Sequence, residues 1–357
     1  MENSSKRVLS ILTVLILLAV TLTGCTGNEG GAAGKTVTIN VFNWGDYIGE
    51  STIRDFEDKY PGIKVNYENF STNEDMYVKI KTGGSAYDVA IPSDYMIKRM
   101  LDEGLLNKID MNNIPNYKFI DQRFKNLSFD PGNEYSVPYM WGTVGILYNK
   151  TMVDDTIDSW EVLWDKKYSK QILMPDSERD SIGVTLKMLG YSMNTKNVAE
   201  LEAARDKLIE QKPLVLAYVV DEVKDMMIGE SAAMAVVWSG DAYYCMSENE
   251  NLEYVIPKEG TNYWFDSMII PSTSKHQKEA ELFIDFMCDP EVAFANADYI
   301  GYATPHSEAM KLLDPELTSD RNAYPLMEDL VNCEIFEYPG DEVNKQYNRI
   351  WTEVKAD

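Results

Sequence analysis

The fold is decided by the stretch Thr36-Val37-Thr38-Ile39-Asn40-Val41-Phe42, which alternates polar and apolar residues as a half-buried strand does. A helix with one apolar face is expected next, over 51–60. Two more strands are expected over 63–67 and 87–91, with a helix over 73–81 between them. This repeated alternation of strand and helix predicts an α/β fold with a mostly parallel sheet.

The same pattern continues towards the C-terminus. Further strands are expected over 137–148, 172–174, 233–237, 252–256 and 268–270, and further helices over 94–104, 199–211, 222–228, 278–287, 290–299 and 342–355. With 45% hydrophobic residues, the chain can bury substantial cores. Its length fits two domains.

Three Trp–Asp units stand out because they are far apart in sequence yet lie at or beside predicted strands. They are Trp44-Gly45-Asp46, Trp238-Ser239-Gly240-Asp241 and Trp264-Phe265-Asp266. In open α/β sheets, ligands bind beyond the carboxyl ends of the strands. If the fold brings the units together, they form a box with aromatic walls and anionic ends. Such a box suits an elongated organic cation, because ammonium groups are attracted to Trp faces and to carboxylates.

Composition limits the partners and cofactors. The formal charge of −25 comes from 33 basic and 58 acidic residues, so no nucleic-acid partner is expected. Acidity fits a cationic ligand only weakly, since many exported proteins are acidic for solubility alone. The two histidines, His276 and His306, are far apart, and the cysteines lack zinc or redox spacing. We therefore expect no metal site and no cofactor.

The N-terminus has the features of a secretory signal. Lys6 and Arg7 precede an apolar run over 8–22, which is too short for an ordinary membrane-spanning helix. The sequence Leu22-Thr23-Gly24-Cys25 resembles a bacterial lipobox. That resemblance implies a signal peptide over 1–24, cleavage before Cys25 and a diacylglycerol group on its sulfur. The glycine-rich segment 25–35 then reads as a lipidated flexible tether. An uncleaved anchor and a cleaved signal without lipid are the alternatives.

Several motifs together resemble the spermidine/putrescine-binding proteins of bacterial ABC transporters. They are Phe42-Asn43-Trp44-Gly45-Asp46-Tyr47, Tyr87-Asp88-Val89 with Pro92-Ser93-Asp94-Tyr95, Tyr139-Met140-Trp141-Gly142, Trp238-Ser239-Gly240-Asp241, Pro257-Lys258-Glu259-Gly260 with Tyr263-Trp264-Phe265-Asp266-Ser267, and Ile300-Gly301-Tyr302-Ala303-Thr304-Pro305. They occur in the family's order, and the likeness covers the chain from about Thr36 onward.

The resemblance implies a two-lobe fold of the type II periplasmic-binding-protein class, each lobe a mixed sheet flanked by helices, with the ligand cleft between the lobes. The implied segments are lobe 1 over 36–141 plus 264–310, lobe 2 over 147–260 plus 316–357, and hinges near 142–146, 261–263 and 311–315. It further implies a monomeric, non-enzymatic receptor on the outer side of the cell membrane, working with an ABC permease and its cytoplasmic ATPase.

Carried over by motif, eleven residues match the family's ligand-binding positions. They are Trp44, Asp46, Tyr47, Ser93, Tyr95, Asp180, Trp238, Asp241, Trp264, Asp266 and Tyr302. Two positions depart from the family pattern: Gly45 replaces a common Thr or Ser, and Ser177 replaces an aspartate of some spermidine binders. Asp241 resembles the putrescine type and Trp264 the spermidine type, so the preferred polyamine stays open.

Other interpretations of the same residues remain. Core packing is the expected role of the other tryptophans, Trp141, Trp160, Trp164 and Trp351. Helix capping is the expected role of Asp94 and Asp176. A sugar- or peptide-binding lipoprotein of the same fold is the main alternative function, although sugars do not require four carboxylates. A secreted hydrolase with paired carboxylates is disfavoured, since nothing distinguishes an acid from a base.

Overall fold

The computed structural model describes residues 36–83 and 86–356 of the chain. The predicted signal peptide, Cys25 and the tether lie outside the described residues. Residues 37–357 form one compact unit.

Nine strands and twelve α-helices are described within that unit. The strands are β1 (Val37–Trp44), β2 (Ile63–Phe70), β3 (Val89–Ala90), β4 (Ser136–Asn149), β5 (Ile172–Pro175), β6 (Val215–Val219), β7 (Met234–Trp238), β8 (Leu252–Val255) and β9 (Tyr263–Ile269). The helices are α2 (Thr52–Lys59), α3 (Asn73–Thr82), α4 (Asp94–Asp102), α5 (Glu178–Met188), α6 (Val198–Gln211), α7 (Glu222–Ile228), α8 (Ser239–Glu248), α9 (Gln277–Met287), α10 (Pro290–Ile300), α11 (Ser307–Met310), α12 (Pro315–Ser319) and α13 (Asp341–Lys355). Short 3-10 turns cover 111–113, 115–119, 122–124, 160–164, 166–168 and 212–214.

The predicted α/β class is confirmed, but the expectation of a mostly parallel sheet is wrong. The strand order is β2-β1-β3-β9-β4-β7-β5-β6, and β8 pairs with β4 outside this path. Parallel pairs join β1 to β2 and β3, and β5 to β6 and β7. Every pair of β4 and the β3–β9 pair are antiparallel. The sheet is mixed because its two parallel parts are joined through the antiparallel strands β4 and β9.

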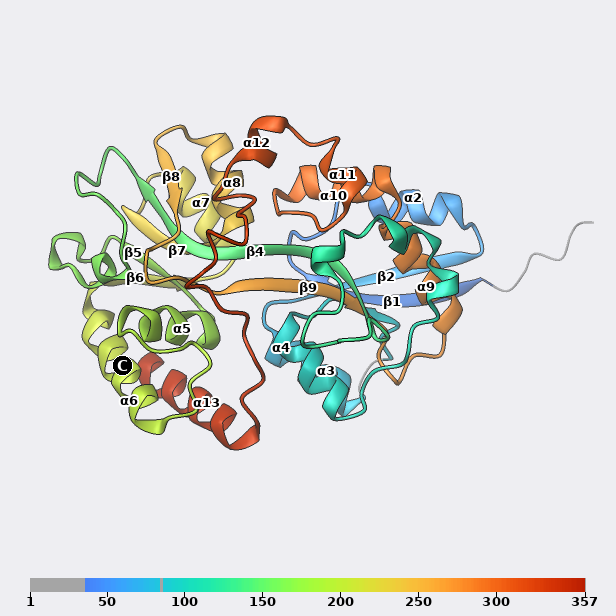
Figure 1. Ribbon diagram of the computed structural model, residues 1–357, viewed down its shortest axis with the longest axis horizontal. Coiled ribbons are helices and arrows are strands. Elements are labelled where there is room, and N and C mark those ends of the chain that lie inside the picture. Colours follow the sequence, from blue (N-terminus) through green and yellow to red (C-terminus); the bar gives the residue numbers. More distant parts are fainter. Residues whose placement is uncertain (1–35, 84–85, 357) are drawn as a thin grey trace, which may run out of the picture. The chain divides into compact units, whose positions relative to one another are not determined.

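Strand β4 changes partners along its length. Its residues up to Thr143 pair with β9, whereas its residues from Val144 onward pair with β7, and its last four residues also pair with β8. Figure 1 shows β4 and β9 running side by side through the middle of the sheet, with α2, α3, α4, α9 and α10 around one part and α5, α6, α7, α8 and α13 around the other.

Most of the tryptophans that were not assigned to the site pack in the hydrophobic core. Trp160 is fully buried, and its indole Nε1 donates to the Gly260 carbonyl at 2.9 Å. Trp141 is also buried, and Trp164 is partly buried with its Nε1 donating to the Lys207 carbonyl at 2.8 Å. The expected packing role is confirmed for these three. Trp351 differs, as described below.

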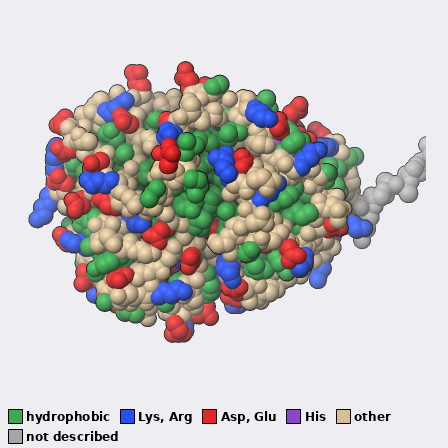
Figure 2. All heavy atoms as spheres, viewed as in Figure 1, with side chains coloured by type: hydrophobic (Ala, Val, Ile, Leu, Met, Phe, Trp, Pro, Cys, Tyr) green, Lys and Arg blue, Asp and Glu red, His purple; other side chains and the backbone are tan. Residues whose placement is uncertain are grey.

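The described surface is charged (Figure 2), and the described cysteines form no disulfide. On the face in Figure 2, acidic and basic side chains are interspersed. Cys245 and Cys288 are buried free thiols, and Cys333 is partly buried. Within residues 36–83 and 86–356, no helix is long and apolar enough to cross a bilayer, and no cluster of His, Cys, Asp and Glu has the geometry to hold a metal ion.

Candidate binding site

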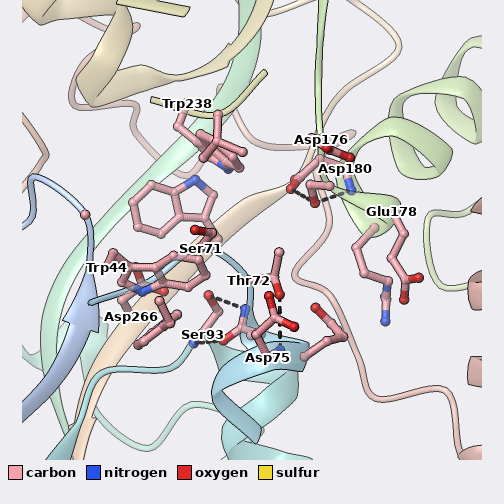
Figure 3. A pocket seen from close by; sticks show the side chains of 18 of the residues that line it. Trp44, Ser71, Thr72, Asp75, Ser93, Asp176, Glu178, Asp180, Trp238 and Asp266 are labelled. Carbon is pink, nitrogen blue, oxygen red and sulfur yellow. Dashed lines mark hydrogen bonds between the residues drawn. The ribbon is translucent and has the colours of Figure 1, made fainter. Parts of the chain in front are cut away.

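One cavity of about 490 Å³ brings the predicted site residues together. All eleven of them line it: Trp44, Asp46, Tyr47, Ser93, Tyr95, Asp180, Trp238, Asp241, Trp264, Asp266 and Tyr302. Figure 3 shows Trp44, Ser93 and Asp266 on one side of this cavity, with Trp238 and Asp180 across from them. The three Trp–Asp units therefore converge as expected, although Trp264 and Asp266 lie within the antiparallel strand β9 and not beyond a strand end.

Local backbone structure explains why each unit presents its two side chains together. Trp264 and Asp266 are two residues apart in β9, so they point to the same face of the sheet. Trp238 is the last residue of β7 and the N-cap of α8, and Asp241 lies in the first turn of that helix. A Cβ atom on Gly240 would lie 2.3 Å from the Tyr302 ring. Glycine in the second motif is therefore required for the close approach of this ring.

The aromatic walls are held in place by contacts between their rings. The Tyr302 ring lies 5.3 Å from the rings of both Trp264 and Tyr47, in edge-to-face geometry. The Trp44 ring packs 4.5 Å from Phe70, and its Nε1 donates to the Ile91 carbonyl at 2.8 Å. These contacts fix the positions of the rings, which limits the side-chain ordering that binding would cost.

Asp266 and Asp180 are the buried acceptors of the cavity. Asp266 is 5% exposed and Asp180 is 7% exposed. One carboxylate oxygen in each, Oδ1, has no hydrogen-bond partner among the described residues. Burial raises the pKa of Asp266 to about 7 and that of Asp180 to about 6. The charge of Asp180 raises the pKa of Asp266 further, so the two carboxylates lie close enough to repel each other. Buried oxygens of this kind need a donor, and a cation would satisfy them best.

The other two predicted acceptors are already partly neutralised. The Asp46 carboxylate is 71% exposed, and its Oδ2 lies 2.8 Å from the Nζ of Lys224. Burial raises the pKa of Asp241 to about 6, while the Lys224 charge acts in the opposite direction. Asp46 and Asp241 thus line the cavity as predicted but share a cation supplied by the protein.

Ser93 and Tyr95 are positioned by neighbours on α3. The Asn73 side chain donates to Ser93 Oγ at 3.0 Å and accepts from its backbone N–H at 3.1 Å. The Tyr95 hydroxyl donates to Glu74 Oε1 at 3.0 Å.

The expected capping roles of Asp94 and Asp176 are not what the structure shows. Ser93 is the N-cap of α4, and the Asp94 carboxylate accepts backbone N–H groups of Tyr95 and Phe265. Asp94 therefore ties α4 to β9.

The cap of α5 is Ser177, whose hydroxyl donates to Asp180 Oδ2 at 2.7 Å. Asp176 instead forms an ion pair with Lys355 at 2.9 Å. Ser177 thus orients a carboxylate that lines the cavity.

Sequence reasoning missed part of the lining. The missed residues include Glu74, Glu178, Arg179, Asp221, Asn262, Phe336, Asn348 and Trp351. Burial, followed by repulsion from Glu74, raises the pKa of Glu178 to about 7. Trp351, expected in the core, lies on α13 and is only partly buried. These residues carry no local motif, so only the tertiary fold identifies them.

Comparison with known proteins identifies the family of this chain. Residues 51–325 match the family model described as bacterial extracellular solute-binding protein. The chain belongs to this family.

Among its relatives, a spermidine/putrescine-binding periplasmic protein of Salmonella typhimurium is 36% identical over 332 residues, covering 92% of this chain and 95% of that protein. A solved structure titled as a putative spermidine/putrescine ABC transporter from Listeria monocytogenes is 48% identical, with a TM-score of 0.87 over 90% of this chain and 99% of that one. The Tp0655 lipoprotein of Treponema pallidum is 28% identical, with a TM-score of 0.79 over 89% of this chain and 99% of that one. The fold is therefore that of the periplasmic binding proteins.

Proposed function

We propose that this chain is the polyamine receptor of an ABC importer, which captures spermidine or putrescine in the cavity and delivers it to the permease. The observation that carries the proposal is the pair of buried carboxylates, Asp180 and Asp266, whose Oδ1 atoms lack partners in a cavity walled by aromatic rings. The names of the relatives support the same ligand class.

The chemistry of a polyamine matches the cavity part by part. Its ammonium groups donate charge-assisted hydrogen bonds to Asp266 and Asp180. Its methylene chain packs on the rings of Trp44, Trp264 and Tyr302, which also attract the adjacent charge. Hydrogen bonds to charged groups contribute about 1.5–3 kcal/mol each, and cation–π contacts contribute about 0.5–2 kcal/mol. A few of each are enough for micromolar or tighter binding once the costs of association are met.

A sugar- or peptide-binding receptor is the alternative within the same fold. Sugars also stack on aromatic rings, but a neutral sugar does not supply the positive charge that two unpartnered buried carboxylates require. A hydrolase would need its two carboxyl groups in distinct protonation roles. Burial raises the pKa of both carboxyls, to about 6 for Asp180 and about 7 for Asp266, so neither is clearly set apart as the acid or the base, and we propose a receptor without catalytic turnover.

We also propose that the cavity closes between the two lobes expected from the sequence, with hinges near 142–146, 261–263 and 311–315. The change of β4 partners between Thr143 and Val144 supports the first hinge. The lining supports closure, since it combines residues of both expected lobes. Small-angle scattering should give a smaller radius of gyration with spermidine than without it, and an unchanged radius argues against closure.

For the N-terminus we propose removal of residues 1–24, lipidation of Cys25 and a tether over 25–35 that holds a monomeric receptor at the outer face of the membrane. The sequence around Cys25 supports this, and a structural relative is titled a lipoprotein. The intact mass of protein extracted from bacterial membranes should exceed that of chain 25–357 by the mass of the lipid. A Cys25→Ala variant that stays in the membrane fraction contradicts the anchor.

Titration calorimetry with putrescine, cadaverine, spermidine and spermine tests the ligand class, with a neutral sugar and a short peptide as comparisons. Asp266→Asn and Trp264→Ala should each weaken polyamine binding at least about tenfold, since each removes one direct contact. Asp102→Asn is the matched control, because Asp102 pairs with Lys98 on the exposed side of α4. Unchanged polyamine affinity in both site variants would falsify the site, and heat of binding from the sugar or peptide alone would favour the alternative receptor.

A further inference from the structure

A lysine that is not itself a lining residue forms an ion pair with Asp46, a carboxylate that lines the cavity. Lys224 lies on α7, 178 positions from Asp46 in the chain, and its Nζ is 2.8 Å from the Asp46 Oδ2. The Lys224 side chain is only 15% exposed. Lys224 is thus held as firmly as Lys187, which is 11% exposed and pairs with Glu334.

Two further carboxylates surround the same ammonium group. Burial lowers the pKa of the Lys224 ammonium, but three carboxylates outweigh that effect and raise it. The three are Asp241, Asp46 and Asp221, and all of them line the cavity. Lys224 is therefore charged at neutral pH and compensates this acidic cluster.

Gly45 makes room for the cluster. A Cβ atom at this position would lie 2.7 Å from the Asp221 Oδ2, which is closer than side chains tolerate. Asp46 next to it has a φ of 45°, a left-handed conformation that is uncommon for residues other than glycine. The loop after β1 is thus shaped to meet the α7 region, and the glycine that departs from the family pattern has a local reason.

The two ends of the cavity consequently differ. At one end, Asp46, Asp221 and Asp241 share the Lys224 ammonium. At the other end, Asp180 and Asp266 each keep an oxygen without a partner among the described residues.

We propose that Lys224 is a built-in ammonium group that neutralises the carboxylates at one end of the cavity and thereby sets the length of polyamine the site prefers. The proposal rests on the proposed polyamine function and deepens it. A diamine places its two ammonium groups at Asp266 and Asp180. The third ammonium of a triamine is repelled by Lys224 or must displace it. The wild-type site therefore favours putrescine relative to longer polyamines.

Removing the lysine charge should reverse this preference. In Lys224→Gln, the Asp46, Asp221 and Asp241 carboxylates become available to a third ammonium group. The ratio of spermidine to putrescine affinity should rise by about tenfold, or about 1.4 kcal/mol. Lys224→Arg keeps the charge and should keep the wild-type ratio. In Lys224→Gln/Asp241→Asn, the gain should shrink, because one of the freed acceptors is gone.

The experiment is titration calorimetry of putrescine, spermidine and spermine with the four proteins, after circular dichroism has established that each is folded. Lys311→Gln is the matched control, because Lys311 is 67% exposed and its partner Glu308, unlike Asp46, does not line the cavity. If Lys224→Gln alone does not fold, the double variant is compared directly with Asp241→Asn, and a smaller rise in the ratio is expected, because Asp46 and Asp221 are still freed.

The outcomes separate the two proposals. A wild type that binds no polyamine overturns the receptor function itself. The role of Lys224 is overturned if the wild type binds polyamines but Lys224→Gln leaves the ratio of spermidine to putrescine affinity unchanged. It is also overturned if Lys224→Gln weakens the binding of all three polyamines equally. The receptor function stands in both cases. Equal loss would mean that Lys224 only holds the loop of Asp46 in place.

Discussion

Asp266→Asn is expected to weaken ligand binding and at the same time to stabilise the ligand-free protein. Asp266 is 5% exposed, and its Oδ1 has no partner among the described residues. Burial raises the pKa of this carboxyl from 3.8 to about 7. A carboxylate that is harder to ionise in the folded protein than in the unfolded chain destabilises the fold wherever it is ionised.

The magnitude follows from the pKa. Each pKa unit corresponds to about 1.4 kcal/mol, so the rise from 3.8 to about 7 sets an upper limit of about 4 kcal/mol. Because the folded-state pKa is the higher one, the contribution of Asp266 to stability is fully present below pH 3.8 and is lost as pH rises through about 7. The neutral asparagine removes this loss but buries an amide, so we expect a gain of about 1–3 kcal/mol at pH 8.

The assay is urea unfolding of the ligand-free protein between pH 4 and pH 8, together with melting temperatures in the presence of spermidine. The gain in unfolding free energy of Asp266→Asn over wild type should shrink steadily as pH falls towards 4. Spermidine should raise the melting temperature of wild type much more than that of the variant.

Asp130→Asn is the matched control for this experiment. Asp130 is 2% exposed, but its carboxylate accepts hydrogen bonds from the backbone N–H groups of Glu134, Tyr135 and Ser136 and from the Ser136 hydroxyl. An amide cannot accept all of these, so this variant should be destabilised. If Asp266→Asn is destabilised to a similar degree at pH 8, Asp266 is a structural carboxylate and the reasoning fails.

Two more predictions follow from the same electrostatics and packing. Polyamine affinity should fall as pH is lowered from 8 to 5, because Asp266 and Asp180, with pKa values of about 7 and about 6, lose the charge that attracts the ligand. Calorimetry in buffers of different ionisation enthalpy should detect protons released on binding near pH 6.5. An affinity that does not change with pH contradicts this prediction. Gly45→Ala should weaken polyamine binding several-fold, because the added Cβ forces Asp221 away. Gly62→Ala is the control and should bind normally, because a Cβ there meets nothing within 4 Å. Equal polyamine affinities in the two variants would remove the argument for a tight loop at Gly45.

The local sequence pattern predicted helices and strands well where the spacing of the apolar residues and the flanking turn residues indicate the same element. The strand–helix–strand succession from β1 to β2 appeared at the expected positions, because polar–apolar alternation marks half-buried strands. Helix α8 was missed, since Trp238-Ser239-Gly240-Asp241 has the composition of a loop and only the packing of Gly240 on Tyr302 explains the glycine. Strand direction was also beyond reach, because the pairing of Val144 with Trp238 joins segments far apart in sequence.

The class of ligand could be predicted from the sequence, but the length of the ligand could not, and the reason is physical. The ligand class depends on residue types, and any fold that gathers Trp264 and Asp266 of β9 with Asp180 of α5 gives an aromatic, anionic box. The ligand length depends on which carboxylates are already neutralised inside the protein. That is decided by Lys224, a residue of a short helix with no local signal to separate it from solvent-exposed lysines. A change of one residue on α7 can therefore alter polyamine preference while every recognisable motif stays the same.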